Sequence, residues 1–227
     1  MKQAEDSEFG RFAILLGTLA TFMCVLPFIS EAGAGAIILR FATAFLLLAA
    51  VYSVSEKRFH LVVVIALALP ALVAQFVPSL LGESWTLMLR MGMSAVVLVY
   101  IAILISVFLV RQDRVSADMI LGAINVYLLF AICFMFIHAF VELARPGSYL
   151  YHGESLSSVL KGHPEVDALA FLLYFSVVTL TTLGYGDITP AFPAARMLCS
   201  LEAVIGQLFV AVFIARMVSL QIGGKSR

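Results

Sequence analysis

The sequence predicts an all-α membrane protein with six transmembrane helices, a short re-entrant helix and a loop that follows it. Hydrophobic residues make up 63% of the chain and charged residues only 12%, with a mean hydropathy of +1.07. A soluble domain carries about 25% charged residues. Six apolar runs are long enough to cross a bilayer, which takes roughly 20 residues. A seventh, Ala168–Leu180, has about 13 residues and is too short to span.

The six predicted spans fall into a group of four and a group of two. They are Phe12–Ile29, Ala36–Val54, Leu61–Leu81, Thr86–Val110, Ile120–Leu143 and Ala195–Leu220. The most charged internal stretch, residues 111–118, links the fourth span to the fifth. We therefore expect a four-helix module over residues 1–110 and a second module over residues 119–227.

Basic residues predict how the chain is oriented. Six spans place both termini on one side, and the termini and the loops on that side carry Lys2, Arg11, Lys57, Arg58, Arg111, Arg114, Lys225 and Arg227. The opposite loops carry only Arg145 and Lys161. Because cytoplasmic loops are enriched in lysine and arginine, we expect a multi-pass protein with both termini in the cytoplasm.

The loop after the short apolar run has an informative sequence. Residues 179–190 read Thr-Leu-Thr-Thr-Leu-Gly-Tyr-Gly-Asp-Ile-Thr-Pro. Successive backbone carbonyls can point toward one axis only if the chain alternates between left-handed and right-handed conformations. Glycine reaches positive φ at little cost, so Gly184 and Gly186 stand where such a loop needs them. Backbone carbonyls arranged in this way can replace the water shell of a cation.

Residues 182–186, Thr-Leu-Gly-Tyr-Gly, resemble the selectivity filter of potassium channels, whose commonest form has valine at the second position. Residues 119–227 resemble the tetrameric potassium channel pore-domain superfamily, and the whole layout resembles prokaryotic six-helix potassium channels without a voltage sensor. Residues 122–129, 142–148 and 201–207 carry looser matches. The resemblance implies a homotetramer in which each chain has an outer helix 120–143, a turret 144–167, a pore helix 168–181, a filter 182–187 and an inner helix 195–220.

The resemblance also implies roles for individual residues. The predicted ion-binding residues are Thr182, Leu183, Gly184, Tyr185 and Gly186, with K⁺ held at the first four. Asp187 is expected at the outer mouth, where Tyr174 would take the place of a tryptophan that hydrogen-bonds to this aspartate. Thr181 is expected to support the filter. Val178 stands where many relatives have a glutamate, so a second buried carboxyl group is missing at that position.

The inner helix adds further candidates. Gly206 stands where relatives place a gating glycine, and a hinge or close helix packing would each explain it. Helical periodicity places Gln207, Val210, Ala211 and Ile214 toward a central cavity, and an interhelix hydrogen bond is the alternative for Gln207. Ionisable residues inside a span are functional candidates. We expect Glu202 to support the filter through Ser176, Thr179 or a backbone group, with a cavity-facing charge as the rival interpretation.

The expected function is passive, K⁺-selective conduction across the plasma (inner) membrane of a prokaryote. Steep voltage gating is not expected, because the fourth span contains only Arg90 and a sensor needs several basic residues there. The alternatives are a weakly selective cation channel, given Leu183, and a non-conducting regulatory or sensor subunit.

Other classes are not favoured. A formal net charge of zero gives no indication of nucleic-acid binding, and no nucleophile–base set or cofactor loop indicates an enzyme. K⁺ as the permeant ion is the expected ligand, with no cofactor. Three further copies of the chain and the lipid bilayer are the expected partners, and a separate regulatory subunit is left open. We expect His152 and His163 to be ordinary solvated loop residues, with proton sensing as the alternative.

Overall fold

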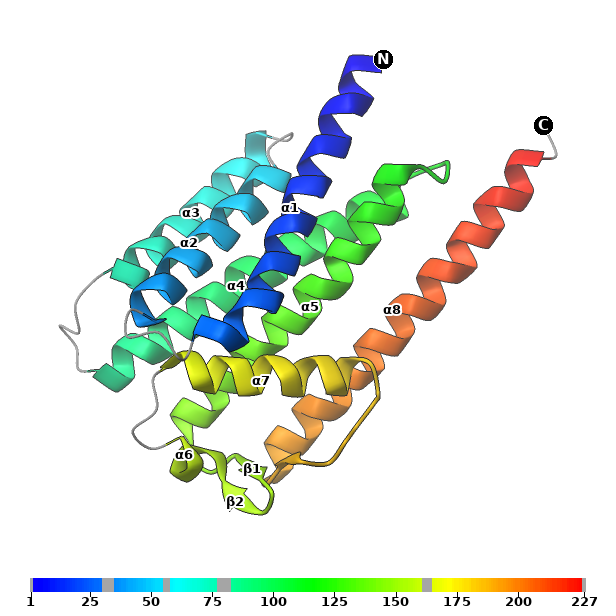
Figure 1. Ribbon diagram of the computed structural model, residues 1–227. Coiled ribbons are helices and arrows are strands. Elements are labelled where there is room, and N and C mark those ends of the chain that lie inside the picture. The colour runs from blue at the N-terminus through cyan, green and yellow to red at the C-terminus, as the bar shows by residue number, and fades with distance from the viewer. Residues whose placement is uncertain (1, 30–34, 55–57, 77–82, 161–164, 226–227) are drawn as a thin grey trace.

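The computed structural model describes residues 2–29, 35–54, 58–76, 83–160 and 165–225. Within these residues, six helices are long and apolar enough to cross a membrane. They are α1 (Lys2–Ile29), α2 (Gly35–Ser53), α3 (Arg58–Phe76), α4 (Glu83–Val110), α5 (Ala117–Ala144) and α8 (Pro193–Lys225). The first turn of α1 and the last turn of α8 lie at the same end of the bundle (Figure 1).

The first four helices pack into a bundle that rests against α5. Leucine fills much of its interior, and Leu15, Leu19, Leu46 and Leu98 are fully buried. Burial of a leucine side chain contributes about 1.5–3 kcal/mol in water, but lipid is as apolar as leucine, so packing and hydrogen bonds have to hold helices together in a membrane. One such bond joins the two modules, where the buried Asn125 Nδ2 of α5 donates to the Phe12 carbonyl of α1 over 2.8 Å.

Helix α1 begins at Lys2, ten residues before the predicted first span, and the bounds of the other spanning helices differ from the predicted spans by up to five residues. Helix α5 begins at Ala117 because the Ser116 side chain accepts a hydrogen bond from the Met119 N–H and caps the helix. Residues 117 and 118 therefore belong to the helix and not to the linker. Helix α8 begins at Pro193, since proline suits the first turn of a helix. The predicted end of the third span, residues 77–81, lies outside the described residues.

The described part of the segment between α5 and α7, residues 145–160, is folded. It contains β1 (Tyr149–Tyr151), β2 (Glu154–Ser155) and the short helix α6 (Leu156–Val159). Strand β1 pairs with β2 and also with β3 (Ile188–Pro190), giving a small antiparallel sheet in the order β2–β1–β3. The Glu142 carboxylate accepts the N–H groups of Gly147 and Tyr149 at 2.9 and 3.0 Å. The sheet thus ties the chain that follows loop 182–187 to the end of α5.

Helix α7 (Glu165–Leu180) lies across the end of the bundle near this sheet, at a large angle to α5 and α8 (Figure 1). It begins three residues earlier and ends one residue earlier than the predicted pore helix. The chain turns at its last residue and returns through β3 to the start of α8. Loop 182–187 is therefore held at both ends, by α7 on one side and by β3 on the other.

Candidate functional site: the loop between α7 and α8

Loop 182–187 has the alternating backbone that its glycines predict. Gly184 has a φ of +59° and Gly186 a φ of +80°, and Thr182 also has a positive φ of +59°. Leu183 and Tyr185 stand between them without positive φ. Every second residue is therefore left-handed, which is the condition for consecutive carbonyls to face one side. The left-handed Thr182 was missed by the sequence argument, because threonine rarely adopts this conformation.

The start of the loop is anchored to the last turn of α7. The Thr182 N–H donates to the Thr179 carbonyl at 3.0 Å, and the Leu183 N–H donates to the Val178 carbonyl at 2.9 Å. The Gly184 N–H also reaches the Val178 carbonyl, at 3.3 Å. The Thr181 hydroxyl donates back to the Val177 carbonyl at 2.7 Å. These bonds satisfy carbonyls that a helix end leaves unpaired, and they compensate for the strain at Thr182.

Asp187 closes the loop through three contacts. The Tyr174 hydroxyl donates to Asp187 Oδ2 at 2.7 Å, and the Ile188 N–H donates to Oδ1 at 3.0 Å. The His152 N–H donates to the Asp187 carbonyl at 2.9 Å. Partial desolvation raises the pKa of Asp187, but the bonds from Tyr174 and Ile188 outweigh it, so the pKa is lowered. The Tyr174 ring also stacks on Tyr185, with centroids 6.4 Å apart.

A buried network of hydrogen-bonded side chains connects α7 to α5 and α8. It contains His138, to which the sequence assigned no role. Glu202 of α8 is fully buried. Its Oε1 accepts the Ser176 hydroxyl of α7, and its Oε2 lies 2.8 Å from His138 Nε2 of α5. The other ring nitrogen, Nδ1, is hydrogen-bonded to the Tyr149 hydroxyl at 2.6 Å. Ser176 Oγ also lies within hydrogen-bond distance of the Ala131 carbonyl oxygen, at 2.8 Å. This chain, Tyr149–His138–Glu202–Ser176, joins α5, β1, α7 and α8.

Glu202 has the contact with Ser176 that the filter-support interpretation requires, and its side chain has no exposed surface in the chain described here. The sequence contained one signal for His138 that was not used. Ionisable residues inside a membrane protein tend to pair with one another. His138 is the ionisable residue of the fifth span nearest in depth to Glu202, since both lie toward the loop end of their helices.

Gly206 is packed against α7. A Cβ atom at this position would lie 2.5 Å from the Leu180 carbonyl oxygen and 2.9 Å from Leu180 Cδ1. The Tyr127 hydroxyl of α5 reaches the same carbonyl at 3.4 Å. Of the two roles expected for Gly206, the geometry favours close packing, because the absence of a side chain lets α8 approach the last turn of α7.

Replacing Gly206 by alanine is therefore expected to separate α8 from α7 and lower stability by about 1–3 kcal/mol, the usual cost of overpacking. The loss should appear in thermal unfolding of the purified protein in detergent. Gly17→Ala in α1 is the matched control, because a Cβ there meets nothing within 4 Å. If the two variants unfold alike, the packing role is wrong.

The four residues predicted to line a cavity, Gln207, Val210, Ala211 and Ile214, are all exposed in the single chain. Their position relative to a pore axis stays a prediction. Arg216, farther along α8, donates from Nη2 to the Gln112 carbonyl at 2.8 Å and so ties the end of α8 to the linker before α5. His163 lies outside the described residues. Among those described, no group of three or more His, Cys, Asp and Glu residues could hold a metal ion.

Comparison with known proteins gives a family match within the second module. Residues 123–221 match the family model described as "Ion channel". The matched segment covers less than half of the chain and includes α7, loop 182–187 and almost all of α8, so the site described above lies within it. The match indicates an ion channel.

Two curated relatives that match this part of the chain are named as potassium channels. "Two pore potassium channel c" of Oryza sativa subsp. japonica is 41% identical over 86 residues, covering 38% of this chain and 18% of that protein. "Inward rectifier potassium channel Kirbac3.1" of Paramagnetospirillum magnetotacticum is 36% identical over 84 residues, covering 37% of this chain and 22% of that protein. The chain thus spans less than a quarter of either relative. The family match and these relatives support a potassium channel.

Proposed function

We propose that four copies of this chain assemble around one axis into a K⁺-selective pore. The alternating backbone of Thr182, Gly184 and Gly186 carries this proposal. Carbonyls that face one side can coordinate a dehydrated cation, and four such loops give the rings of oxygens that favour K⁺. Helix α7 ends at Leu180, directly before the loop. The negative end of its dipole would add to the attraction of a cation.

The exposed apolar surface of α8 supports the assembly. In the 18-residue apolar stretch of α8, 17% is buried inside the chain, compared with 61% in the corresponding stretch of α5. Leu201, Val204 and Leu208 are among its exposed side chains. One chain supplies one loop, which cannot surround an ion, so neighbouring copies are needed both to cover α8 and to close the site.

We place the pore in the plasma membrane of a prokaryote, with both termini in the cytoplasm and α7 re-entering from outside. The distribution of basic residues supports this orientation. Helix α4 contains Arg90 as its single basic residue, so opening should depend only weakly on voltage, because each gating charge contributes ~2.3 kcal/mol per 100 mV.

The reversal potential tests the function. Purified protein in a planar bilayer, with K⁺ on one side and Na⁺ on the other, should reverse near the K⁺ equilibrium potential. Reversal near zero with clear current would show a weakly selective cation pore. The absence of current at every voltage, under membrane tension and over a range of pH, would favour a non-conducting subunit.

Acid inhibition tests the role of Tyr174. Because its hydrogen bond helps to lower the pKa of Asp187, the carboxylate should stay charged to lower pH than an ordinary aspartate. The charged Asp187 carboxylate stabilises the folded loop at pH values above the pKa that this group has in the unfolded chain. This contribution is lost as the pH falls through the lower pKa of the folded state. In Tyr174→Phe, the loss of K⁺ current on external acidification should therefore begin at higher pH.

Tyr52→Phe is the control for this experiment, since Tyr52 is half exposed on α2 in the other module. An unchanged acid-inhibition curve for Tyr174→Phe would contradict the proposed role of the Tyr174–Asp187 bond.

A further inference from the structure

Loop 182–187 has an anchor at each end, and a buried network connects the two anchors without passing through the loop. Helix α7 holds the start of the loop through hydrogen bonds in its last turn, and β3 follows the end of the loop and pairs with β1. The hydrogen-bonded side chains Tyr149–His138–Glu202–Ser176 lead from β1 to α7. The network therefore restricts how far apart the two ends of the loop lie.

His138 is the centre of this network. Both ring nitrogens have a partner, because Nδ1 lies 2.6 Å from the Tyr149 hydroxyl and Nε2 lies 2.8 Å from Glu202 Oε2. The ring also contacts the rings of Phe134 and Phe175, whose centroids lie 6.0 and 5.2 Å from its own, and it has no exposed surface. These contacts fix the orientation of the imidazole, so Tyr149 and Glu202 are held at a fixed separation.

Ser176 carries the constraint into the part of α7 that holds the loop. It precedes Val178 and Thr179 by two and three residues, and their carbonyls accept N–H groups of the loop. Because Cα atoms lie about 2.3 Å from a helix axis, a rotation of α7 by about 10° would move them by about 0.4 Å. A functional site has to be held to within about 0.5 Å. The bond between Ser176 and Glu202 limits this rotation and therefore the displacement of the loop carbonyls.

We propose that His138 is a positioning residue for K⁺ selectivity, which holds the two anchors of loop 182–187 together through Tyr149 on one side and Glu202 on the other. This role rests on the proposed K⁺ pore. Without the network, the ends of the loop could move, and the rings of carbonyl oxygens could contract around the smaller Na⁺. Breaking the network should therefore raise the permeability of Na⁺ relative to K⁺.

The permeability ratio of K⁺ to Na⁺ tests this role in the full chain. His138→Phe removes both hydrogen bonds and keeps an aromatic ring. Its ratio, from the reversal potential in planar bilayers, should be about tenfold below that of the unchanged protein, since one buried group without its partner costs free energy of that order. Tyr149→Phe and Ser176→Ala each remove one hydroxyl, at opposite ends of the network, and should each lower the ratio. The double variant should be no less selective than the less selective single variant, because one break already disconnects the two anchors.

Leu98→Ala is the control for a loss of stability alone. Leu98 is fully buried in α4, in the four-helix module, so its truncation should leave a cavity and lower the unfolding temperature in detergent. The permeability ratio of this variant should equal that of the unchanged protein.

Three outcomes would overturn the role of His138: variants at His138, Tyr149 and Ser176 that lose stability but keep the ratio, a similar fall of the ratio in Leu98→Ala, or additive losses in the double variant. If the unchanged protein does not select K⁺ in the same bilayers, the proposed function fails and the role of His138 fails with it. An unchanged protein that selects K⁺ beside equally selective variants overturns the role of His138 alone.

Discussion

Gly184→Ala and Gly186→Ala are each expected to abolish K⁺ current while the chains still assemble. Both positions have positive φ, and a Cβ at either would meet nothing within 4 Å in the chain. The effect therefore comes from the backbone. A non-glycine residue in the left-handed region costs about 1–2 kcal/mol, which in a tetramer applies four times at the same ring. Relaxing that strain would rotate the carbonyls away from the axis.

The measurement is current in planar bilayers, with the oligomeric state of each variant checked by native mass spectrometry. Gly153→Ala is a close control. Gly153 has a φ of +88° and open space around its Cβ position, but it lies between β1 and β2 and not in the loop. The Gly153→Ala variant should therefore have the same local backbone strain but an unchanged K⁺ current. Normal current through Gly184→Ala or Gly186→Ala would remove loop 182–187 as the conduction path.

Glu202→Leu is expected to cause the largest loss of stability. Glu202 has no exposed surface and joins His138 to Ser176. Leucine would leave the imidazole and the hydroxyl buried without that partner, and breaking a buried pair in this way costs about 3–5 kcal/mol. Thermal unfolding in detergent should show the loss. Glu154→Leu, at an exposed position in β2, should unfold like the unchanged protein.

A double variant tests whether His138 and Glu202 stabilise the protein as a pair or independently of each other. If His138 and Glu202 act together, the loss in His138→Leu/Glu202→Leu should be smaller than the sum of the two single losses, since replacing both partners removes the unsatisfied groups. Strictly additive losses would contradict the pairing. Glu202→Gln should stay close to the unchanged protein in stability and conductance. A large fall in its conductance at unchanged stability would instead favour a charge that faces the cavity.

The sequence by itself determined the membrane class, the six apolar spans found among the described residues and the position of the candidate filter loop. These features depend on local chemistry. Apolar length decides what can cross a bilayer, and glycine is the residue type that supplies positive φ without strain, so Gly184 and Gly186 could be recognised without any knowledge of their neighbours. The aromatic partner of Asp187, Tyr174, could be named as well, because the resemblance to potassium-channel pores implies an aromatic hydrogen-bond partner 13 residues before this aspartate.

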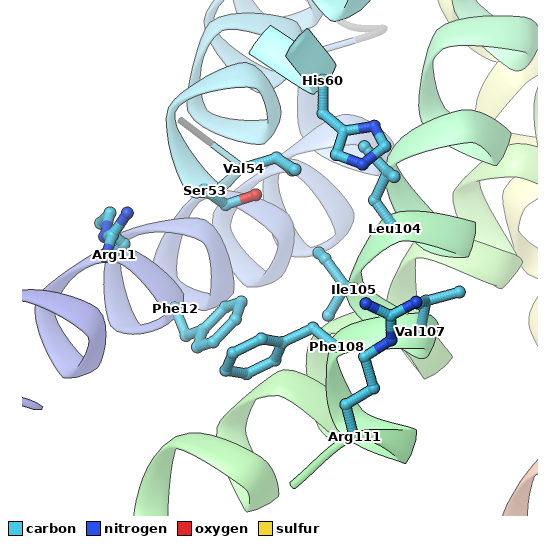
Figure 2. A pocket seen from close by; sticks show the side chains of 10 residues that line it. All are labelled: Arg11, Phe12, Ser53, Val54, His60, Leu104, Ile105, Val107, Phe108 and Arg111. Carbon is cyan, nitrogen blue, oxygen red and sulfur yellow. The ribbon is translucent and has the colours of Figure 1, made fainter. Parts of the chain in front are cut away.

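Only the tertiary structure decided the contacts that depend on how helices are placed against each other. His138 and Glu202 are 64 residues apart, and their pairing depends on the rotation of α5 and α8 about their axes, which a nearly uniform apolar sequence does not reveal. The same is true of Gly206, for which a hinge and a packing contact predict the same residue. The cavity lined by Phe12, Ser53, His60 and Phe108 is a further example, because α1, α2, α3 and α4 each supply one of these residues and they surround one space only after the bundle has closed (Figure 2).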